Sequence, residues 1–237
     1  ANRLARGASY GFAMLALAGA LVSPLHWLGE HLFTFHMIEH EIVMAVAAPL
    51  IVVGRPAGVF LWSLPYALRR PVAAIFVGPL PLGAWRWVTR PMNATVLHGA
   101  AIWLWHIPVV FDAAVVDVTL HRLQHLSFLV TAIFFWWAML RRSAGGVAVW
   151  HLFVTMIHTS VLGAWMALAP RVLYHVQTAG APGFGLTPLE DQQLAGIIMW
   201  IPAETAYAGA ALALMALWIR RSRSVTDAPT PRLGHVA

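Results

Sequence analysis

The chain has no cysteine, no lysine and few charged residues of any kind. Without cysteine it can form neither a disulfide framework nor a thiolate metal site, so metal chemistry would depend on imidazole, thioether and carboxylate groups. Charged residues make up 10% of the 237 residues, whereas a soluble domain has roughly 25%. Hydrophobic residues make up 60%, and the mean hydropathy is +0.72. This composition excludes an ordinary soluble domain and predicts an integral membrane protein.

The positive net charge does not indicate a nucleic-acid partner. The formal charge of +6 comes from arginines that occur in small groups between apolar runs, which is typical of topology signals in membrane proteins. The sequence also has no phosphate-binding loop and no arrangement of a nucleophile with a base. We therefore expect a protein that lies in a lipid membrane, is not an enzyme and binds no nucleic acid.

Apolar segments predict one all-α domain over residues 1–237, a polytopic bundle of about six transmembrane helices. The expected spans are residues 8–22, 36–53, 93–111, 118–140, 147–168 and 194–219. Residues 71–85 are apolar but shorter than the roughly 20 residues that a span needs, and they contain several prolines. We expect this segment to be interfacial or re-entrant. Residues 1–22 also have features of a secretory signal peptide, but we interpret them as the first span.

The arginine distribution predicts that both termini are cytoplasmic. With six spans, the groups at 3–6, 55–90, 141–142 and 220–223 fall on one side of the membrane. Loops rich in arginine favour the cytoplasm. This topology places most of the histidines in outer loops or at outer helix ends.

The stretch from His36 to Met44 predicts one wall of a metal site. His36 and His40 share a helix face, because residues advance by about 100° along a helix. Glu39 flanks this face, and Met37 and Met44 close its other side. Both histidines lie at the mouth of the expected span, where we expect them to be wet.

Two further elements bring histidines to the same outer level. His106 lies near the end of the third expected span, and His121 and His125 lie at the start of the fourth. An i, i+4 pair presents two imidazoles on one face, which suits a transition metal. The predicted metal ligands are therefore His36, Met37, His40, His106, His121 and His125.

Copper is the metal that this ligand set favours, because thioethers beside imidazoles suit Cu(I). Haem is the second candidate, since histidines on membrane helices also form axial pairs. Two ligands four residues apart on one helix suit a single ion better than a porphyrin.

Other histidines have a plainer interpretation, and an interfacial or hydrogen-bonded role stays open for the predicted ligands too. His98 and His158 lie deeper in their spans, so we expect them to be hydrogen-bonded packing residues. His151 and His235 are expected to be cytoplasmic and solvated.

Five residues could assist the predicted metal ligands without being their main donors. They are Glu39 and Met44, described above, and three further acidic residues, Asp112, Asp191 and Glu204. Glu204 lies in the middle of the last span, where an ionisable group is costly and has a function or a specific partner. It could instead be a neutral carboxyl bonded to a neighbouring Ser, Thr or Trp. Asp112 and Asp191 lie at outer helix ends, where they could orient a ligand or cap a helix.

Several motifs extend over most of the chain from the second span onward. They are His36-Met37 with His40 and Met44, Trp105-His106-Ile107-Pro108 with Asp112-Ala113-Ala114, His121 with His125-Leu126-Ser127-Phe128, and Leu186 to Gly196 followed by Met199-Trp200-Ile201-Pro202. Together they resemble the caa3-type cytochrome c oxidase assembly factor family of CtaG-like multi-span membrane proteins. The resemblance implies a bacterial inner-membrane protein that helps to mature a haem-copper oxidase by handling copper at the outer face. An oxidase subunit would be its client.

Three departures from the family pattern limit this comparison. Gln124 stands where an acidic residue is expected, and Glu204 stands where a small residue is expected. We also expect a further N-terminal helix of the family to be missing from the sequence as given. Two other functions stay open: a haem-binding electron-transfer protein of the membrane, and a permanent accessory subunit of a respiratory complex.

Overall fold

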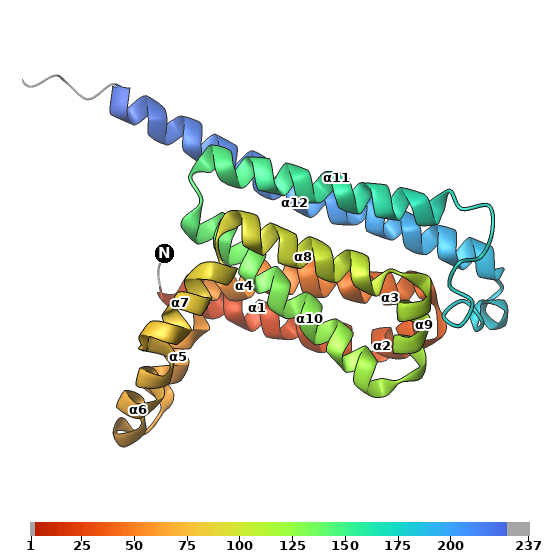
Figure 1. Cartoon of the computed structure of the whole chain (residues 1–237), viewed down its shortest axis with the longest axis horizontal. Coiled ribbons are helices and arrows are strands. Elements are labelled where there is room, and N and C mark those ends of the chain that lie inside the picture. Colours follow the sequence, from red (N-terminus) through yellow and green to blue (C-terminus); the bar gives the residue numbers. More distant parts are fainter. Residues whose placement is uncertain (1–2, 227–237) are drawn as a thin grey trace, which may run out of the picture.

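The computed structural model describes residues 3–226, and every regular element in this range is helical (Figure 1). The α-helices are α1 (Arg3–Leu21), α2 (Pro24–His31), α3 (Phe33–Glu41), α4 (Ala48–Gly54), α5 (Pro56–Ser63), α6 (Tyr66–Val77), α7 (Pro79–Val88), α8 (Pro91–Trp105), α9 (Pro108–Val116), α10 (Val118–Trp137), α11 (Gly145–Ala167) and α12 (Pro188–Thr226). The long helices lie side by side in a bundle. The predicted all-α architecture is confirmed, whereas His235 lies outside the described residues.

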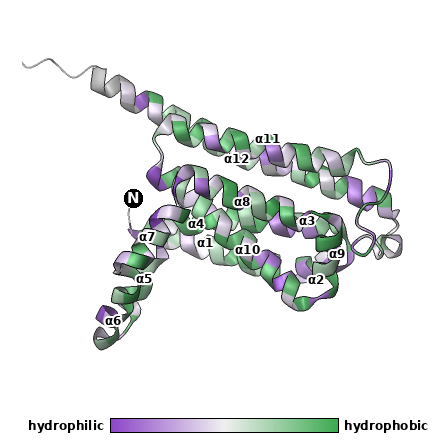
Figure 2. Cartoon of the chain, in the orientation of Figure 1, coloured by the Kyte–Doolittle hydropathy of each residue, from purple (hydrophilic) through white to green (hydrophobic). Residues whose placement is uncertain are grey.

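Within the described residues, five helical segments are long and apolar enough to cross a membrane. They are Arg3–Leu21, Phe33–Gly54, Val118–Arg142, Gly145–Ala167 and Pro188–Arg220. A sixth span exists if the bent pair of α8 and α9 crosses as one unit. Hydrophobic residues run along these helices (Figure 2). The chain is therefore a multi-pass membrane protein.

The third expected span, residues 93–111, is not one straight helix. The axes of α8 and α9 differ by 75°. Pro108 explains the break, because proline disfavours the α conformation of the preceding residue and has no N–H to donate. Ile107 is accordingly extended, with φ −65° and ψ 122°. The bend leaves His106 at the corner and turns α9 toward α3, where Phe111 packs on Phe33 with ring centroids 5.0 Å apart.

Residues 24–35, which lie between the first two expected spans, contain helix α2. The hydroxyl of Ser23 accepts a hydrogen bond from the Leu25 N–H at 3.0 Å, and Pro24 occupies the first helical turn. Both are favourable at a helix start. Gly29 lets α2 lie close to α3, since a Cβ at this position would overlap the Glu39 carboxylate. The loop before the second span is thus a structured cover for α3.

A π-helical segment, Ile42–Ala47, joins α3 to α4. Pro49 in the first turn of α4 explains why regular α-helical bonding is interrupted here, because its nitrogen cannot donate to the carbonyl four residues earlier. Such wide turns occur often at functional sites. The segment therefore divides one span into two halves.

Residues 55–90 form an arm that extends away from the bundle as α5, α6 and α7 (Figure 1). The segment expected to be interfacial or re-entrant, residues 71–85, lies in α6 and α7, and neither helix is long enough to cross a membrane. A hydrophilic tip at α6 separates two largely apolar stretches of the arm (Figure 2). Arg55, at the start of the arm, has a positive φ of 51°.

Helices α11 and α12 pack through two glycines. A Cβ on Gly163 would lie 2.9 Å from the Gly196 carbonyl oxygen, so only glycine permits this approach. Helix α11 also packs against α8, and this second contact buries a polar group. His151 is 7% exposed and bonds Thr95 at 3.0 Å; the prediction that His151 is solvated was wrong, because α8 covers it.

Candidate metal centre

Helix α3 carries the first two histidines of the centre on one face. The rings of His36 and His40 lie one turn apart, with centroids separated by 4.4 Å. Both residues are 1% exposed, so the prediction of a wet helix mouth was wrong. The cause is α9, which the bend at Pro108 directs over them: the Phe111 ring lies 5.2 Å from His36 and 6.4 Å from His40.

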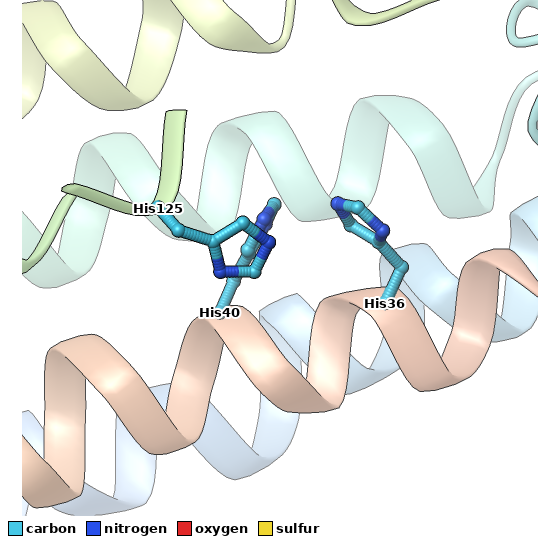
Figure 3. A group of neighbouring side chains, drawn as sticks. All are labelled: His36, His40 and His125. Carbon is cyan, nitrogen blue, oxygen red and sulfur yellow. The ribbon is translucent and has the colours of Figure 1, made fainter. Parts of the chain in front are cut away.

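Helix α10 brings a second pair to the same place. The Nε2 atoms of His121 and His125 are 2.9 Å apart, and the His125 ring lies 5.0 Å from His40 and 5.6 Å from His36. Figure 3 shows His125 reaching from α10 toward the two histidines of α3. One nitrogen from each of these three rings lies within 4.8 Å of the others. Because metal–nitrogen bonds are about 2 Å long, small side-chain movements would close the trio around one ion.

The buried nitrogens of this cluster lack partners. Within the described residues, neither nitrogen of His40 and neither nitrogen of His36 makes a hydrogen bond, and Nδ1 of His125 makes none. The Gly29 backbone is close enough to act on the His36 ring, but the geometry between them falls short of a hydrogen bond. A buried polar atom without a partner costs about 1–3 kcal/mol, and such atoms are few in native proteins. A bound cation would use these lone pairs.

His106 lies at the corner between α8 and α9 and is 1% exposed. Its Nδ1 donates to the Ile102 carbonyl at 2.7 Å, which leaves the lone pair on Nε2. That atom has no partner within the described residues, and the ring centroid lies 6.1 Å from that of His40. A backbone bond that fixes the tautomer is common for metal-binding histidines. His106 is therefore placed to act as a further metal ligand beside His36, His40 and His125.

The carbonyl of His106 is held by a loop residue. The Tyr174 hydroxyl, in the loop between α11 and α12, donates to this oxygen at 2.7 Å. Burial, with a smaller effect from Asp112, raises the pKa of the Tyr174 phenol. The phenol therefore stays protonated and keeps its hydrogen bond across the physiological pH range.

Glu39 places a buried carboxylate beside the histidines. It is 0% exposed and faces Nδ1 of His26 at 3.2 and 3.3 Å. Its Oε2 lies 3.9 Å from Nε2 of His125. One ligand atom from each of His36, Glu39 and His121 also lies within 4.8 Å of the others. The two trios share His36, and the second is nearer the surface, since His121 is only partly buried.

His26 is the residue that sequence reasoning missed as part of the site. It lies outside the expected spans, but α2 aims it at Glu39, and its ring lies 5.7 Å from that of His121. The helix-start signal of Ser23 and Pro24 was present in the sequence and could have located α2.

The two methionines are buried in the hydrophobic core. Met37 is 1% exposed and Met44 is 2% exposed, and the Met44 carbonyl accepts the indole N–H of Trp136 at 2.9 Å. Both belong to the same cluster of core side chains. Their role as thioether ligands stays a prediction.

Asp191 acts as a helix cap across the bundle. From α12, its carboxylate accepts the Phe33 N–H at 2.7 Å and the Thr34 N–H at 3.0 Å, and it also accepts the Thr34 hydroxyl at 2.7 Å. These are the first N–H groups of α3, which otherwise lack partners. Of the two interpretations of Asp191, capping is the observed one, and the capped helix is the one that carries His36 and His40.

The remaining auxiliary candidates take different positions. Asp112 lies on α9, and its Oδ1 has no hydrogen-bond partner within the described residues. Glu204 accepts the Thr159 hydroxyl at 2.7 Å, one of the neighbours expected for a carboxyl at membrane depth. Gln124, which stands where the family pattern has an acidic residue, precedes His125 in α10 and is 1% exposed.

Fold and site together define a class: a multi-pass membrane protein whose helices enclose a buried cluster of histidines with one carboxylate. The sequence model of one family, the cytochrome c oxidase caa3 assembly factors, matches residues 2–221. The chain belongs to this family, which confirms the resemblance seen in its motifs.

Two similar proteins are much longer than this chain. Uncharacterized proteins of Mycobacterium bovis and of Mycobacterium tuberculosis are each 26% identical to the chain over 219 residues, which is 84% of this chain and 32% of theirs. The chain thus spans about a third of the length of the curated relatives that it matches. No solved structure matches it.

Proposed function

We propose that this protein binds a copper ion between α3 and α10 and delivers it to a subunit of a haem-copper oxidase. The observation that carries the proposal is the convergence of His36, His40 and His125, because five of their six ring nitrogens are buried without a hydrogen-bond partner within the described residues. The family supplies the client, because its members are cytochrome c oxidase assembly factors.

Copper is the preferred cargo because of the donor atoms. Three to four imidazoles and no thiolate favour copper or zinc, and Met37 or Met44 would add a soft ligand for Cu(I). A cargo site must also release its ion. The second trio, with His121 and Glu39, offers a route from the buried site to the surface, since it shares His36 and is less buried.

The proposed setting is a bacterial inner membrane, with the histidine cluster at the outer face. The arginine groups support this orientation through the positive-inside rule. In this setting the protein is not an enzyme: the cluster binds an ion and passes it on.

Haem is the weaker alternative. Its axial ligands would need to lie on opposite faces of a porphyrin. The rings of His36, His40 and His125 already contact one another, at 4.4 to 5.6 Å between centroids. A macrocycle would have to separate them.

Metal analysis of the purified protein tests the proposal. We expect about one copper per chain, and loss of most of it in His40→Asn, a change that keeps a polar side chain of similar size at the buried position. The matched control is His175→Ala, at an exposed position in the loop after α11, which should retain copper. Folding is checked in both variants by helical circular dichroism and by elution as a single species.

Three other results would decide against the proposal. A Soret band in the purified protein would identify haem, and stoichiometric co-purification with a complete oxidase would identify a permanent subunit. Full copper content and normal oxidase maturation in His40→Asn would show that the cluster is not the site.

A further inference from the structure

A second candidate site lies at the end of the bundle opposite the histidine cluster. Figure 1 places the start of α1 and the junction of α4 with α5 there, far from α2 and α9. Two cavities of about 830 and 790 Å³ open at this junction. Both are lined by Arg6, Arg55, Pro56 and Gly58, so they are parts of one site.

The lining of this site carries charge of one sign. Its arginines are Arg3, Arg6, Arg55, Arg141 and Arg142, and no carboxylate residue lines either cavity. Among the described residues, no arginine makes an ion pair with a carboxylate, since the ion pairs found there all involve histidine. Arg6 and Arg55 act electrostatically on Arg141. Like charges that lie close together repel each other, so a bound anion would relieve this repulsion.

Contacts of the arginines leave part of their donor capacity unused. Arg141 donates through Nη2 to the Val52 carbonyl at 3.1 Å, but its buried Nε has no partner within the described residues. Arg142 donates through Nη1 to the Arg86 carbonyl at 2.8 Å. These bonds fix the two side chains of the π-helical segment Ala138–Arg142, which follows α10, while other N–H groups stay available.

Arg55 holds a strained backbone conformation at the centre of the site. It is the only described non-glycine residue with positive φ, at 51°. This region is unfavourable for a residue with a Cβ. Gly54 is next to it and packs on α1, where a Cβ would lie 3.0 Å from that of Tyr10. The chain therefore turns at a tight contact with α1 and presents a charged side chain there.

The walls of the site are aromatic and apolar. Tyr10, Phe60 and Trp62 line one cavity, and Trp85 and Trp137 line the other. Tyr10 and Phe60 pack edge to face, with centroids 5.7 Å apart. An inorganic anion would need only the arginines. A ligand that combines an anionic phosphate with hydrocarbon chains matches both parts of the lining.

We propose that this site binds an anionic phospholipid, with its phosphate between Arg6 and Arg55 and its acyl chains along the aromatic walls. Arginine binds phosphate oxygens with two parallel hydrogen bonds. Basic pockets between membrane helices are suited to anionic headgroups, because each basic residue contributes about 1 kcal/mol near such a surface. The site is independent of the copper proposal, since it uses other residues at the other end of the bundle.

Lipid retention by the full-length protein tests the inference. The purified protein is equilibrated with equal amounts of phosphatidylglycerol and phosphatidylcholine, and bound lipid is counted by native mass spectrometry. We expect phosphatidylglycerol to be retained preferentially. Arg6→Gln with Arg55→Gln should reduce that preference about 30-fold, the value that corresponds to the loss of two basic contacts.

Control variants separate the site from general charge and from misfolding. Arg171→Gln removes one exposed arginine from the loop after α11 and should leave the preference unchanged. Arg6→Lys with Arg55→Lys keeps the charge but not the paired donors, so it should show an intermediate preference even if the glutamine variant does not fold. Equal retention of both lipids by the native protein would overturn the inference. Displacement of phosphatidylglycerol by millimolar inorganic phosphate would also overturn it, because the ligand would then be the free anion.

Discussion

The carboxylate of Asp191 accepts the backbone N–H of Phe33 at 2.7 Å, across 158 positions of sequence. The contact fixes the start of α3 to α12 and so sets the height of His36 in the bundle. We expect Asp191→Ala to lower the free energy of unfolding by about 1–2 kcal/mol, the usual cost of a lost helix cap, and to weaken copper binding. Denaturation in detergent and metal titration measure the two effects.

Glu190 provides the matched control for this cap. It accepts the Thr187 N–H at 2.7 Å within its own exposed turn, so Glu190→Ala should leave copper binding unchanged. Equal effects of the two substitutions on copper affinity would mean that Asp191 does not position α3.

Gly29→Ala should weaken the metal centre although it replaces no histidine. The new Cβ would overlap the Glu39 carboxylate and push it from His26, at a cost of about 1–3 kcal/mol for an overpacked position. We expect a lower melting temperature and slower copper uptake. Gly11→Ala is the control, because a Cβ there meets nothing within 4 Å; a similar loss in both variants would reject the explanation.

Tyr174→Phe should destabilise the corner that holds His106. It removes the donor to the His106 carbonyl, and a buried carbonyl without its partner costs about 1–3 kcal/mol. The free energy of unfolding measures this loss. The raised pKa of the Tyr174 phenol predicts that the native contact persists at neutral and mildly alkaline pH. A native protein that loses this stability at pH 9 would contradict that assignment.

Copper affinity should fall as the pH decreases. Only neutral imidazoles bind the ion, and the ordinary pKa of histidine is about 6.5. Burial disfavours a protonated ring, so protons compete with copper for the buried cluster only at pH values well below 6.5. Metal titrations at pH 7.5, 5.5 and 4.0 test this, and the loss of affinity is expected between the last two values. Equal affinity at all three values would point to a site that does not use the histidine nitrogens.

The topology of the chain across the membrane is a separate prediction. Reporter fusions after Arg142 and after Gly180 should lie on opposite sides of the membrane, because the single span Gly145–Ala167 separates them. Fusions that report the same side would require a different number of spans.

Helical periodicity was enough to pair His36 with His40 and His121 with His125, because an i, i+4 spacing fixes a shared face within one helix. It could not show that His26 belongs beside Glu39, since that contact depends on the close approach of α2 to α3 at Gly29. The burial of His36 was also beyond it. A proline in the sequence indicates a break, but the direction in which Phe111 then turns depends on packing with Phe33 and Tyr174. Nor did composition reveal that Asp191 caps a helix other than its own.

The wide turn at Ile42–Ala47 holds one extra residue without changing the phase of the second span. A π-helical turn holds one residue more than an α-helical turn, so deleting one residue between 42 and 47 would tighten the turn and leave its total rotation nearly the same. His36 and His40 would then keep their direction relative to Val52, whereas deletion of Ile51 from the regular helix α4 would rotate them by about 100° and point them away from α10. The shortened segment would still be long and apolar enough to cross the membrane. Insertion of this helix into the bilayer and the direction in which it aims its ligands are therefore separable properties.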